Sequence, residues 1–295
     1  MQVSFQSQWM VTSGFQLGIF IISALVFAAI TTWQLKKGIQ LKSITGFFVF
    51  MAVFHVFKIA GGVTGLVFLK SDKFNKGVFI ATYIFDSISV GFLLRGVSSL
   101  VQHMLSQKLR ANIMGKLAQP TYLGTRNDEF ELLGDETSVK KEISDAESTL
   151  EAQKKKDPLK NTPFRVVTIV LLAAVITSVV GTSSLTEGDT SSTAETLLRV
   201  SSVLFVVGDV LLVASLLYLW AQGEEYVRVA PLLILALLIL LVRCAYSIVS
   251  AFHGVSFDQP SRYMLMFGDY KYYAFMGLLV EAIADIFLLL AYSRW

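Results

Sequence analysis

The sequence predicts an all-α, polytopic membrane protein: a bundle of seven transmembrane helices with its N-terminus outside and its C-terminus in the cytoplasm. Composition gives the first indication, because the 295 residues are 54% hydrophobic and only 16% charged, against roughly 25% charged in an ordinary soluble domain. The second is that the apolar residues gather into seven blocks of about 20 residues, the length of helix that crosses the hydrocarbon core of a bilayer. The third is the distribution of Lys and Arg residues, which concentrate on one side of these blocks.

The first three blocks cover residues 15–33, 43–69 and 77–101. The first ends at Trp33, which Lys36 and Lys37 follow closely. An aromatic residue next to cations is typical of the boundary between hydrocarbon and anionic headgroups. A short turn rich in lysine separates the second block from the third. Each block therefore has a polar boundary at the point where a helix would leave the membrane.

The segment 105–164 differs in composition from the blocks on either side. It is rich in Lys, Glu, Asp, Gln and Ser, and it contains no apolar block long enough to cross a membrane. Its low hydrophobicity predicts a cytoplasmic loop that is largely disordered. We therefore expect one membrane domain in two stretches, with helices 1–3 in residues 1–104 and helices 4–7 in residues 165–295.

The last four blocks cover residues 165–183, 196–221, 230–252 and 270–292. Short polar links separate them. The chain has only five prolines, which suits long uninterrupted helices because proline breaks a helix interior. The single cysteine, Cys244, lies inside the sixth block. A lone cysteine excludes an intrachain disulfide and a cysteine-based metal site.

Counting the Lys and Arg residues near the block ends predicts the orientation, since these residues favour the cytoplasmic side. With the N-terminus outside, thirteen of them lie on the inner side and five or six on the outer side. The net charge of +3 is small and scattered, so no nucleic-acid partner is expected. The lipid bilayer is the expected partner, as the plasma membrane or an endosomal or vacuolar membrane.

Seven ionisable residues fall near the middle of the apolar blocks. A charge at the centre of an inserted helix costs about 2.5–3.5 kcal/mol, so six charges, with the histidine neutral, cost roughly 15–20 kcal/mol. This exceeds a typical folding free energy of about 5–15 kcal/mol. The side chains must therefore pair with one another, line a wet cavity or be neutralised. They are His55, Lys58, Asp86, Asp209, Arg243, Glu281 and Asp285.

Helical spacing predicts partners for most of these residues. Glu281 and Asp285 are four residues apart and share one face of the seventh helix. We expect Arg243 to face both carboxylates, because its planar guanidinium can hold a carboxylate through two hydrogen bonds. Lys58 is expected to pair with Asp86 between the second and third helices.

The charges also follow a pattern that repeats between the first three spans and the last three. Spans 1–3 and 5–7 run in the same directions, and the second helix of each triplet carries a deep cation, Lys58 or Arg243. The third helix of each triplet carries a deep carboxylate, Asp86 or Glu281. Parallel triplets joined by one helix are a known plan of transporters. Asp209, on the fifth span, has no evident mate and can pair with either basic residue.

The sixth and seventh spans also carry a family resemblance. Its residues are Pro231-Leu-Leu, Leu241-Val-Arg243-Cys-Ala-Tyr246-Ser247 and Phe252, followed by Tyr273, Met276, Gly277 and Glu281. They resemble an uncharacterised group of fungal seven-transmembrane proteins, catalogued as a domain of unknown function. The resemblance implies a seven-helix fold with Arg243, Tyr246 and Glu281 at its recurrent polar positions, and it departs at Lys58, where an arginine is expected. A remoter similarity is to the fungal lipid-translocating exporter-like family.

A short motif in the expected loop points to a cytosolic partner. The run from Asp128 to Leu132 and Leu133, Asp-Glu-Phe-Glu-Leu-Leu, resembles an acidic dileucine sorting signal. Adaptors read such signals on cytosolic segments. The resemblance implies a cytosolic adaptor as a partner and favours an endosomal or vacuolar membrane.

Three classes of function fit these observations. We favour a transporter of a small molecule or lipid, or a receptor-like binder, whose polar site at mid-membrane depth takes an apolar or amphipathic ligand. The alternatives are an intramembrane enzyme similar to terpene cyclases, in which buried acids protonate a prenyl substrate, and a structural scaffold. No cofactor, metal or catalytic residue is assigned. The candidate site comprises His55, Lys58, Asp86, Asp209, Arg243, Tyr246, Glu281 and Asp285.

Overall fold

A computed structural model of the chain describes residues 2–37, 41–71, 75–117, 158–185, 191–221, 229–253, 262–264 and 268–294. The chain forms two compact units, one of Met1–Val101 with Val166–Trp295 and the other of Gln102–Arg165. The first unit holds the candidate site. Every regular element among the described residues is helical, which confirms the all-α class.

Seven helical segments among these residues are long and apolar enough to cross a membrane, as predicted. The seventh consists of three consecutive pieces, the middle one a π-helix. In chain order the elements are α1 (Gln2–Lys36), α2 (Leu41–Lys70), α3 (Lys76–Leu117), α5 (Pro158–Ser184), α6 (Ser191–Ala221), α7 (Ala230–Phe252), α8 (Tyr270–Tyr272), η2 (Tyr273–Leu278) and α9 (Leu279–Arg294).

The predicted boundaries are closest where the sequence has a strong local signal. Helix α7 begins and ends where the sixth block does, with a proline in its first turn, a position that proline favours. Helix α1 instead begins at Gln2, well before residue 15. Helical structure also extends into both ends of the expected 105–164 loop, since α3 reaches Leu117 and α5 begins at Pro158. The sorting motif at Asp128, Leu132 and Leu133 lies outside the described residues.

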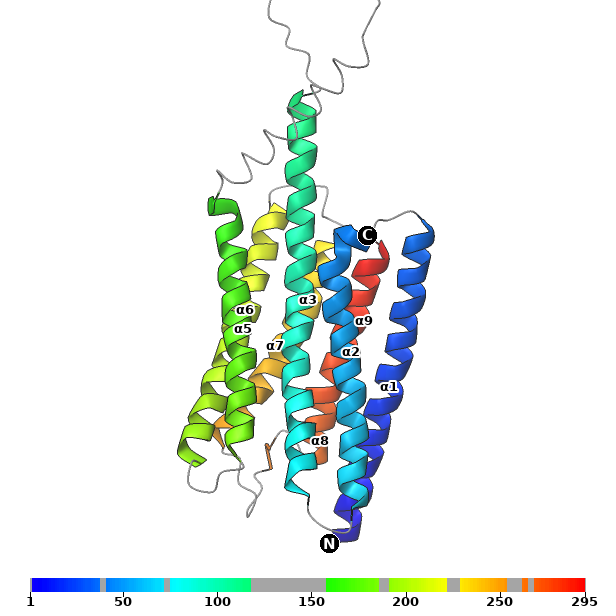
Figure 1. Cartoon of the computed structure of the whole chain (residues 1–295), viewed down its shortest axis with the longest axis vertical. Coiled ribbons are helices and arrows are strands. Elements are labelled where there is room, and N and C mark those ends of the chain that lie inside the picture. The colour runs from blue at the N-terminus through cyan, green and yellow to red at the C-terminus, as the bar shows by residue number, and fades with distance from the viewer. Residues whose placement is uncertain are drawn as a thin grey trace, which may run out of the picture. The chain divides into compact units, whose positions relative to one another are not determined.

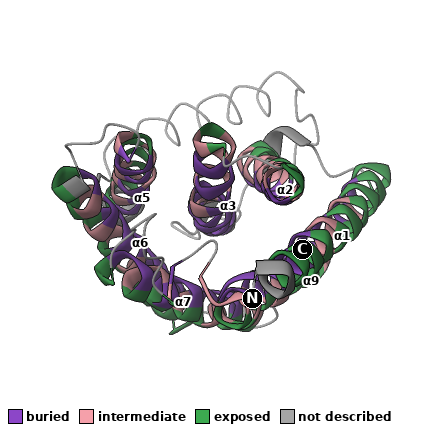
Figure 2. Ribbon diagram, turned by 90° about the horizontal axis from the view of Figure 1, so that it is seen from below, coloured by how far each residue is buried: buried purple, intermediate pink, exposed green. Residues whose placement is uncertain are grey.

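Within the first unit the helices run alongside one another (Figure 1). Seen from one end, α5, α3 and α2 form a row that faces an arc of α6, α7, α9 and α1 (Figure 2). Helix α3 lies in the middle of its row, and its Leu93, Leu94 and Val97 are fully buried. The outward faces carry apolar side chains such as Leu25 and Ile169, which are 66% and 65% exposed. Apolar side chains on the outside of a helical bundle suit contact with lipid.

Candidate functional site

Four of the predicted charges meet in one ring near the middle of their membrane spans. Lys58 on α2, Asp86 on α3, Arg243 on α7 and Glu281 on α9 are each at most 1% exposed. The Asp86 Oδ1 atom lies 2.6 Å from Lys58 Nζ, and its Oδ2 atom lies 2.9 Å from Arg243 Nη2. Glu281 Oε1 lies 2.5 Å from Arg243 Nε, and Glu281 Oε2 contacts Lys58 Nζ. Cations and carboxylates therefore alternate around the ring, and their formal charges cancel.

Neutral side chains from α1 and η2 complete the ring. The Tyr273 hydroxyl lies 2.9 Å from Asp86 Oδ1 and 2.9 Å from Gln16 Oε1, so it can donate to either oxygen. Gln16 in turn donates through Nε2 to the main-chain oxygen of Lys58 at 3.3 Å. Such hydrogen bonds are what a buried ion pair requires, because mutual attraction alone does not offset the cost of removing charges from water.

The π-helix η2 places Tyr273 against the ring. Trp9 of α1 packs on the tyrosine with ring centroids 5.4 Å apart. Gly277, one turn further on, leaves room for the aromatic ring, since a Cβ atom there would lie 3.2 Å from Tyr273 Cδ2. Single π-helical turns occur frequently at functional sites. Here the turn stands directly before the helix that carries Glu281.

Arg243 uses each of its three guanidinium nitrogens. Beyond its two carboxylate contacts, Nη1 donates to Ser247 Oγ at 2.7 Å. The ring of Tyr246 lies with its centroid 5.8 Å from Arg243 Cζ, and the Tyr246 hydroxyl donates to the main-chain oxygen of Met264 at 3.4 Å. Tyr246 therefore packs beside the arginine and ties α7 to the residues before α8.

A second polar cluster lies one helical turn from the ring. His55 Nε2 is 3.3 Å from Asp285 Oδ2 and 3.1 Å from Ser23 Oγ, and the Ser23 hydroxyl donates to the same carboxylate oxygen. His55 Nδ1 lies 2.7 Å from the main-chain oxygen of Met51. A carbonyl only accepts hydrogen bonds, so Nδ1 carries a proton. His55, Ser23 and Asp285 thus connect α2, α1 and α9 below the ring.

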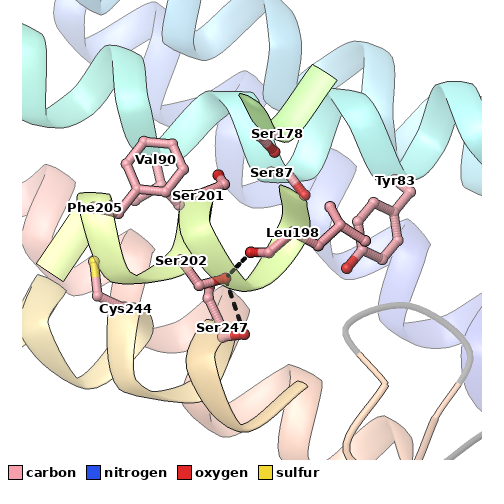
Figure 3. Close-up of a pocket in the computed structure, with 10 residues that line it drawn as sticks. All are labelled: Tyr83, Ser87, Val90, Ser178, Leu198, Ser201, Ser202, Phe205, Cys244 and Ser247. Carbon is pink, nitrogen blue, oxygen red and sulfur yellow. Dashed lines mark hydrogen bonds between the residues drawn. The ribbon is translucent and has the colours of Figure 1, made fainter. Parts of the chain in front are cut away.

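A cavity of about 20 Å³ adjoins the ring, large enough for one water molecule. Helices α3, α5, α6 and α7 enclose it, and hydroxyl groups surround much of it (Figure 3). Ser247 belongs to its wall as well as to the contacts of Arg243. The cavity and the ring therefore share a side chain. The hydroxyl-bearing lining residues are Tyr83, Ser87, Ser178, Ser201, Ser202 and Ser247.

Comparison with known proteins identifies the family. The family model described as "Domain of unknown function (DUF7702)" matches residues 143–292, just over half of the chain. The chain belongs to the DUF7702 family. No match was found among curated proteins or among solved structures. The matched part of the DUF7702 chain includes Asp209, Arg243 and Glu281, whereas Lys58 and Asp86 lie before it.

The ring confirms two of the predicted contacts in the DUF7702 protein. Lys58 pairs with Asp86 and Arg243 pairs with Glu281. The expected contact between Arg243 and Asp285 is wrong. Asp285 lies about 6 Å further along α9, where His55 and Ser23 are its partners.

Asp209, for which the sequence showed no evident mate, pairs with neither Lys58 nor Arg243. Its side chain is fully buried on α6, and neither carboxylate oxygen has a hydrogen-bond partner among the described residues. The guanidinium of Arg243 is directed instead to Asp86, Glu281 and Ser247. Asp209 is therefore a buried acid outside the ring.

Sequence reasoning missed the uncharged members of both clusters. Gln16, Ser23 and Ser247 are polar residues inside apolar helices, and a search for charges does not select them. Tyr273 and Ser247 appeared among the residues of the family resemblance, without a role in a polar cluster. A signal existed in each case, since a polar side chain deep in a transmembrane helix tends to face the bundle interior.

Proposed function

We propose that this membrane protein is a transporter of a lipid or small molecule, or a receptor-like binder, with its functional centre at the ring of Lys58, Asp86, Arg243 and Glu281. One observation carries the proposal. The ring divides into two neutral ion pairs, Lys58–Asp86 within spans 1–3 and Arg243–Glu281 within spans 5–7. Each half of the membrane domain thus carries its own cation and its own carboxylate.

This arrangement lets the two halves separate without leaving a charge unpaired. Separation breaks the cross-contacts of Arg243 with Asp86 and of Lys58 with Glu281, while each side chain keeps the partner in its own half. Removing one partner of a buried pair outright costs about 3–5 kcal/mol. A ring that opens between its two pairs avoids that cost, so a closed and an open arrangement can be close in free energy.

Several transporter families are built from two repeats. Their sites lie near the bilayer midplane, between two repeats that rock against each other. An ionisable residue inside the membrane is expensive and by default marks a functional site. Opening the ring would expose four charged groups at mid-depth, where a polar headgroup or a small polar molecule could replace the cross-contacts.

A scaffold is the second candidate, and the close mutual pairing of all four charges favours it. Such pairing fixes helix register whether or not the ring ever opens. The two candidates differ in whether the cross-contacts exchange, and this difference is measurable.

A vesicle assay tests the transport proposal with a fluorescent phospholipid as the probe. We expect the purified chain to move the probe between leaflets faster than protein-free vesicles do, and Glu281→Gln to abolish the gain. Glu195→Gln is the matched control, because Glu195 pairs with Arg199 on a partly exposed face of α6. Equal rates for wild type and protein-free vesicles would reject lipid transport. Equal rates for wild type and Glu281→Gln would show that transport does not depend on the ring.

A further inference from the structure

Among the described arginines inside the membrane spans, Arg95 is the one without a carboxylate partner. Three arginines lie inside these spans rather than at their ends: Arg95 on α3, Arg199 on α6 and Arg243 on α7. Arg199 pairs with Glu195, and Arg243 pairs with the carboxylates of the ring. None of the ion pairs between described residues involves Arg95. Because a charge inside a membrane span is expensive, it is expected to meet a partner.

The two neighbours of α3 in the row of α5, α3 and α2 (Figure 2) hold the Arg95 side chain between them. On one side, Arg95 Nη1 donates to the Thr168 hydroxyl of α5. On the other side, Arg95 Cζ lies 5.4 Å from the centroid of the Phe50 ring of α2. Arg95 is half-buried. A guanidinium has five N–H groups, so most of them are left for an acceptor from outside the described protein.

Arg95 points away from the ring of charges. It follows Asp86 by nine residues, about two and a half helical turns, so the two side chains leave opposite sides of α3. Asp86 is fully buried. The residues that share the face of Arg95 include Phe85, Phe92 and Ser99, and like Arg95 they are half-exposed. This face of α3 is therefore open to the surrounding lipid.

An aromatic ladder of four phenylalanine rings runs from Arg95 along the contact between α2 and α3. Phe50 stacks on Phe92 with ring centroids 6.4 Å apart. Phe57 continues the ladder, with its centroid 5.2 Å from that of Phe92 and 5.4 Å from that of Phe85. All four rings are half-exposed. Since α2 and α3 are antiparallel, the ladder leads from the guanidinium toward the middle of the membrane. A cation followed by an apolar strip matches the phosphate and acyl chain of a phospholipid.

The depth of Arg95 in the membrane also suits a phospholipid headgroup. Thr168 is the fourth residue of the span Arg165–Ser184, and Phe50 is the sixth of the span Thr45–Lys70. These two partners of Arg95 therefore lie roughly 5–8 Å from the ends of their spans, a distance that an extended arginine side chain can bridge. Both span ends are on the side predicted to face the cytoplasm, where anionic lipids are concentrated.

We propose that Arg95 binds the phosphate of an anionic phospholipid from the cytoplasmic leaflet, with Thr168 holding the guanidinium and one acyl chain lying along the aromatic ladder. The planar guanidinium suits a phosphate because it can donate two parallel hydrogen bonds to it. Helices α2, α3 and α5 contain one acidic residue, Asp86, and it points to the ring. The ammonium of a zwitterionic headgroup would therefore find no carboxylate on these helices, and a headgroup with net negative charge is preferred.

Lipid binding at Arg95 does not depend on transport by the ring, since the two sites lie on opposite faces of α3. A chain that moves no lipid could still hold one at Arg95, and a ring that opens could work with this site empty. A binding measurement at Arg95 and a transport measurement on the ring can therefore fail independently.

Native mass spectrometry of the full chain in detergent tests the proposal, with phosphatidylglycerol and phosphatidylcholine of identical acyl chains as the probes. We expect the wild type to bind one phosphatidylglycerol with a Kd about tenfold below that for phosphatidylcholine, the change that one hydrogen bond to a charged group brings. Arg95→Gln should remove this preference. Arg199→Gln is the matched control, because Arg199 has its own carboxylate in Glu195, and it should keep the preference.

Equal affinities of the wild type for the two lipids would overturn the proposal, and so would a preference that Arg95→Gln leaves unchanged or that Arg199→Gln removes as well. An excess of inorganic phosphate should not displace the bound lipid. Displacement would mean that the site takes a free anion and would overturn the assignment to a lipid. If Arg95→Gln does not fold, Thr168→Val decides, because it removes the hydroxyl that holds the guanidinium: a weaker preference supports the site, and an unchanged one rejects it.

Discussion

Each guanidinium nitrogen of Arg243 has its own acceptor, and the acceptors come from three helices: Asp86 on α3, Glu281 on α9 and Ser247 on α7 itself. Lys58, with a single ammonium group, reaches only the two carboxylates. The planar fork of arginine suits this role, because it fixes the directions of several bonds at once. The residue thus determines how α3, α7 and α9 meet at mid-depth.

Removing one charge from the ring should lower the free energy of unfolding more than removing a cation and a carboxylate together. Arg243→Met leaves two buried carboxylates to share Lys58, and we expect it to lose about 3–5 kcal/mol of unfolding free energy. The double variant Arg243→Met/Glu281→Gln leaves the Lys58–Asp86 pair intact and should be close to wild type. Denaturant unfolding of the detergent-solubilised protein measures the unfolding free energy of both variants. A double variant as unstable as the sum of its single variants would contradict the pairing.

The hydroxyl of Tyr273 should contribute to stability through the ring and not only through packing. Tyr273→Phe keeps the aromatic contact with Trp9 but removes the hydroxyl that lies beside Asp86 and Gln16. We expect a loss of about 1–3 kcal/mol, the range for leaving a buried polar group unsatisfied. Thermal unfolding would show a lower Tm, and an unchanged Tm would mean that the hydroxyl contributes nothing.

At the scale of single residues, the sequence predicted which charges form pairs. It did not predict how far along the helix axis each partner lies. Counting charges and helical faces predicted the contacts of Lys58 with Asp86 and of Arg243 with Glu281. It could not exclude Asp285, because four residues of helix keep two side chains on one face while moving them about 6 Å apart. The choice between them depends on His55, whose place depends on how α2 lies against α9.

At the scale of the element, local signals explain which boundaries could be predicted. Proline in the first turn determines where α7 begins. The π-helix Tyr273–Leu278 could not be predicted from hydrophobic periodicity, because its residues are as apolar as those of any α-helical turn. The full length of α1 could not be predicted either, because its first residues are uncharged but only mildly apolar.

Packing of α3 against α5 and α6 gives a prediction at this scale. A Cβ atom on Gly91 would lie 2.5 Å from Val175 Cγ2 and 3.1 Å from Phe205 Cε1. Gly91→Ala should therefore lower the unfolding free energy by about 1–3 kcal/mol through overpacking. Gly14→Ala is the control, since nothing lies within 4 Å of a Cβ atom there and alanine favours a helix by about 1 kcal/mol. Equal Tm shifts for the two variants would contradict this packing.

At the scale of the whole molecule, the distribution of Lys and Arg residues predicts the orientation in the membrane, and the fold alone does not. The seven spans found among the described residues are an odd number, which would put the two termini on opposite sides, and Figure 1 shows the termini at opposite ends of the bundle. The excess of basic residues near one set of helix ends predicts which end faces the cytoplasm.

Protease protection in sealed microsomes, whose cytoplasmic face is outward, tests this orientation. A tag after residue 295 should be digested without detergent, and a tag before residue 1 only after detergent is added. The reverse pattern would place the C-terminus outside the cytoplasm. Accessibility of both tags or of neither would contradict an odd number of spans.

The central claim is that the ring joins two halves that can separate, each with its own ion pair. Exchanging one pair, Arg243→Glu with Glu281→Arg, keeps that half neutral but sets like charges against Lys58 and Asp86 across the ring. Spin labels on α2 and α7 can report the separation, at Lys70 and at His253 just after α7, both exposed, with Cys244 replaced by Ala.

Electron–electron distance measurements in lipid then give the result most directly. We expect the exchanged variant to populate longer distances than the wild type. Exchanging Lys58 and Asp86 as well should restore the wild-type distribution, because cations and carboxylates alternate again. One narrow distribution, identical in all three proteins, would contradict the account and leave the ring a static structural feature.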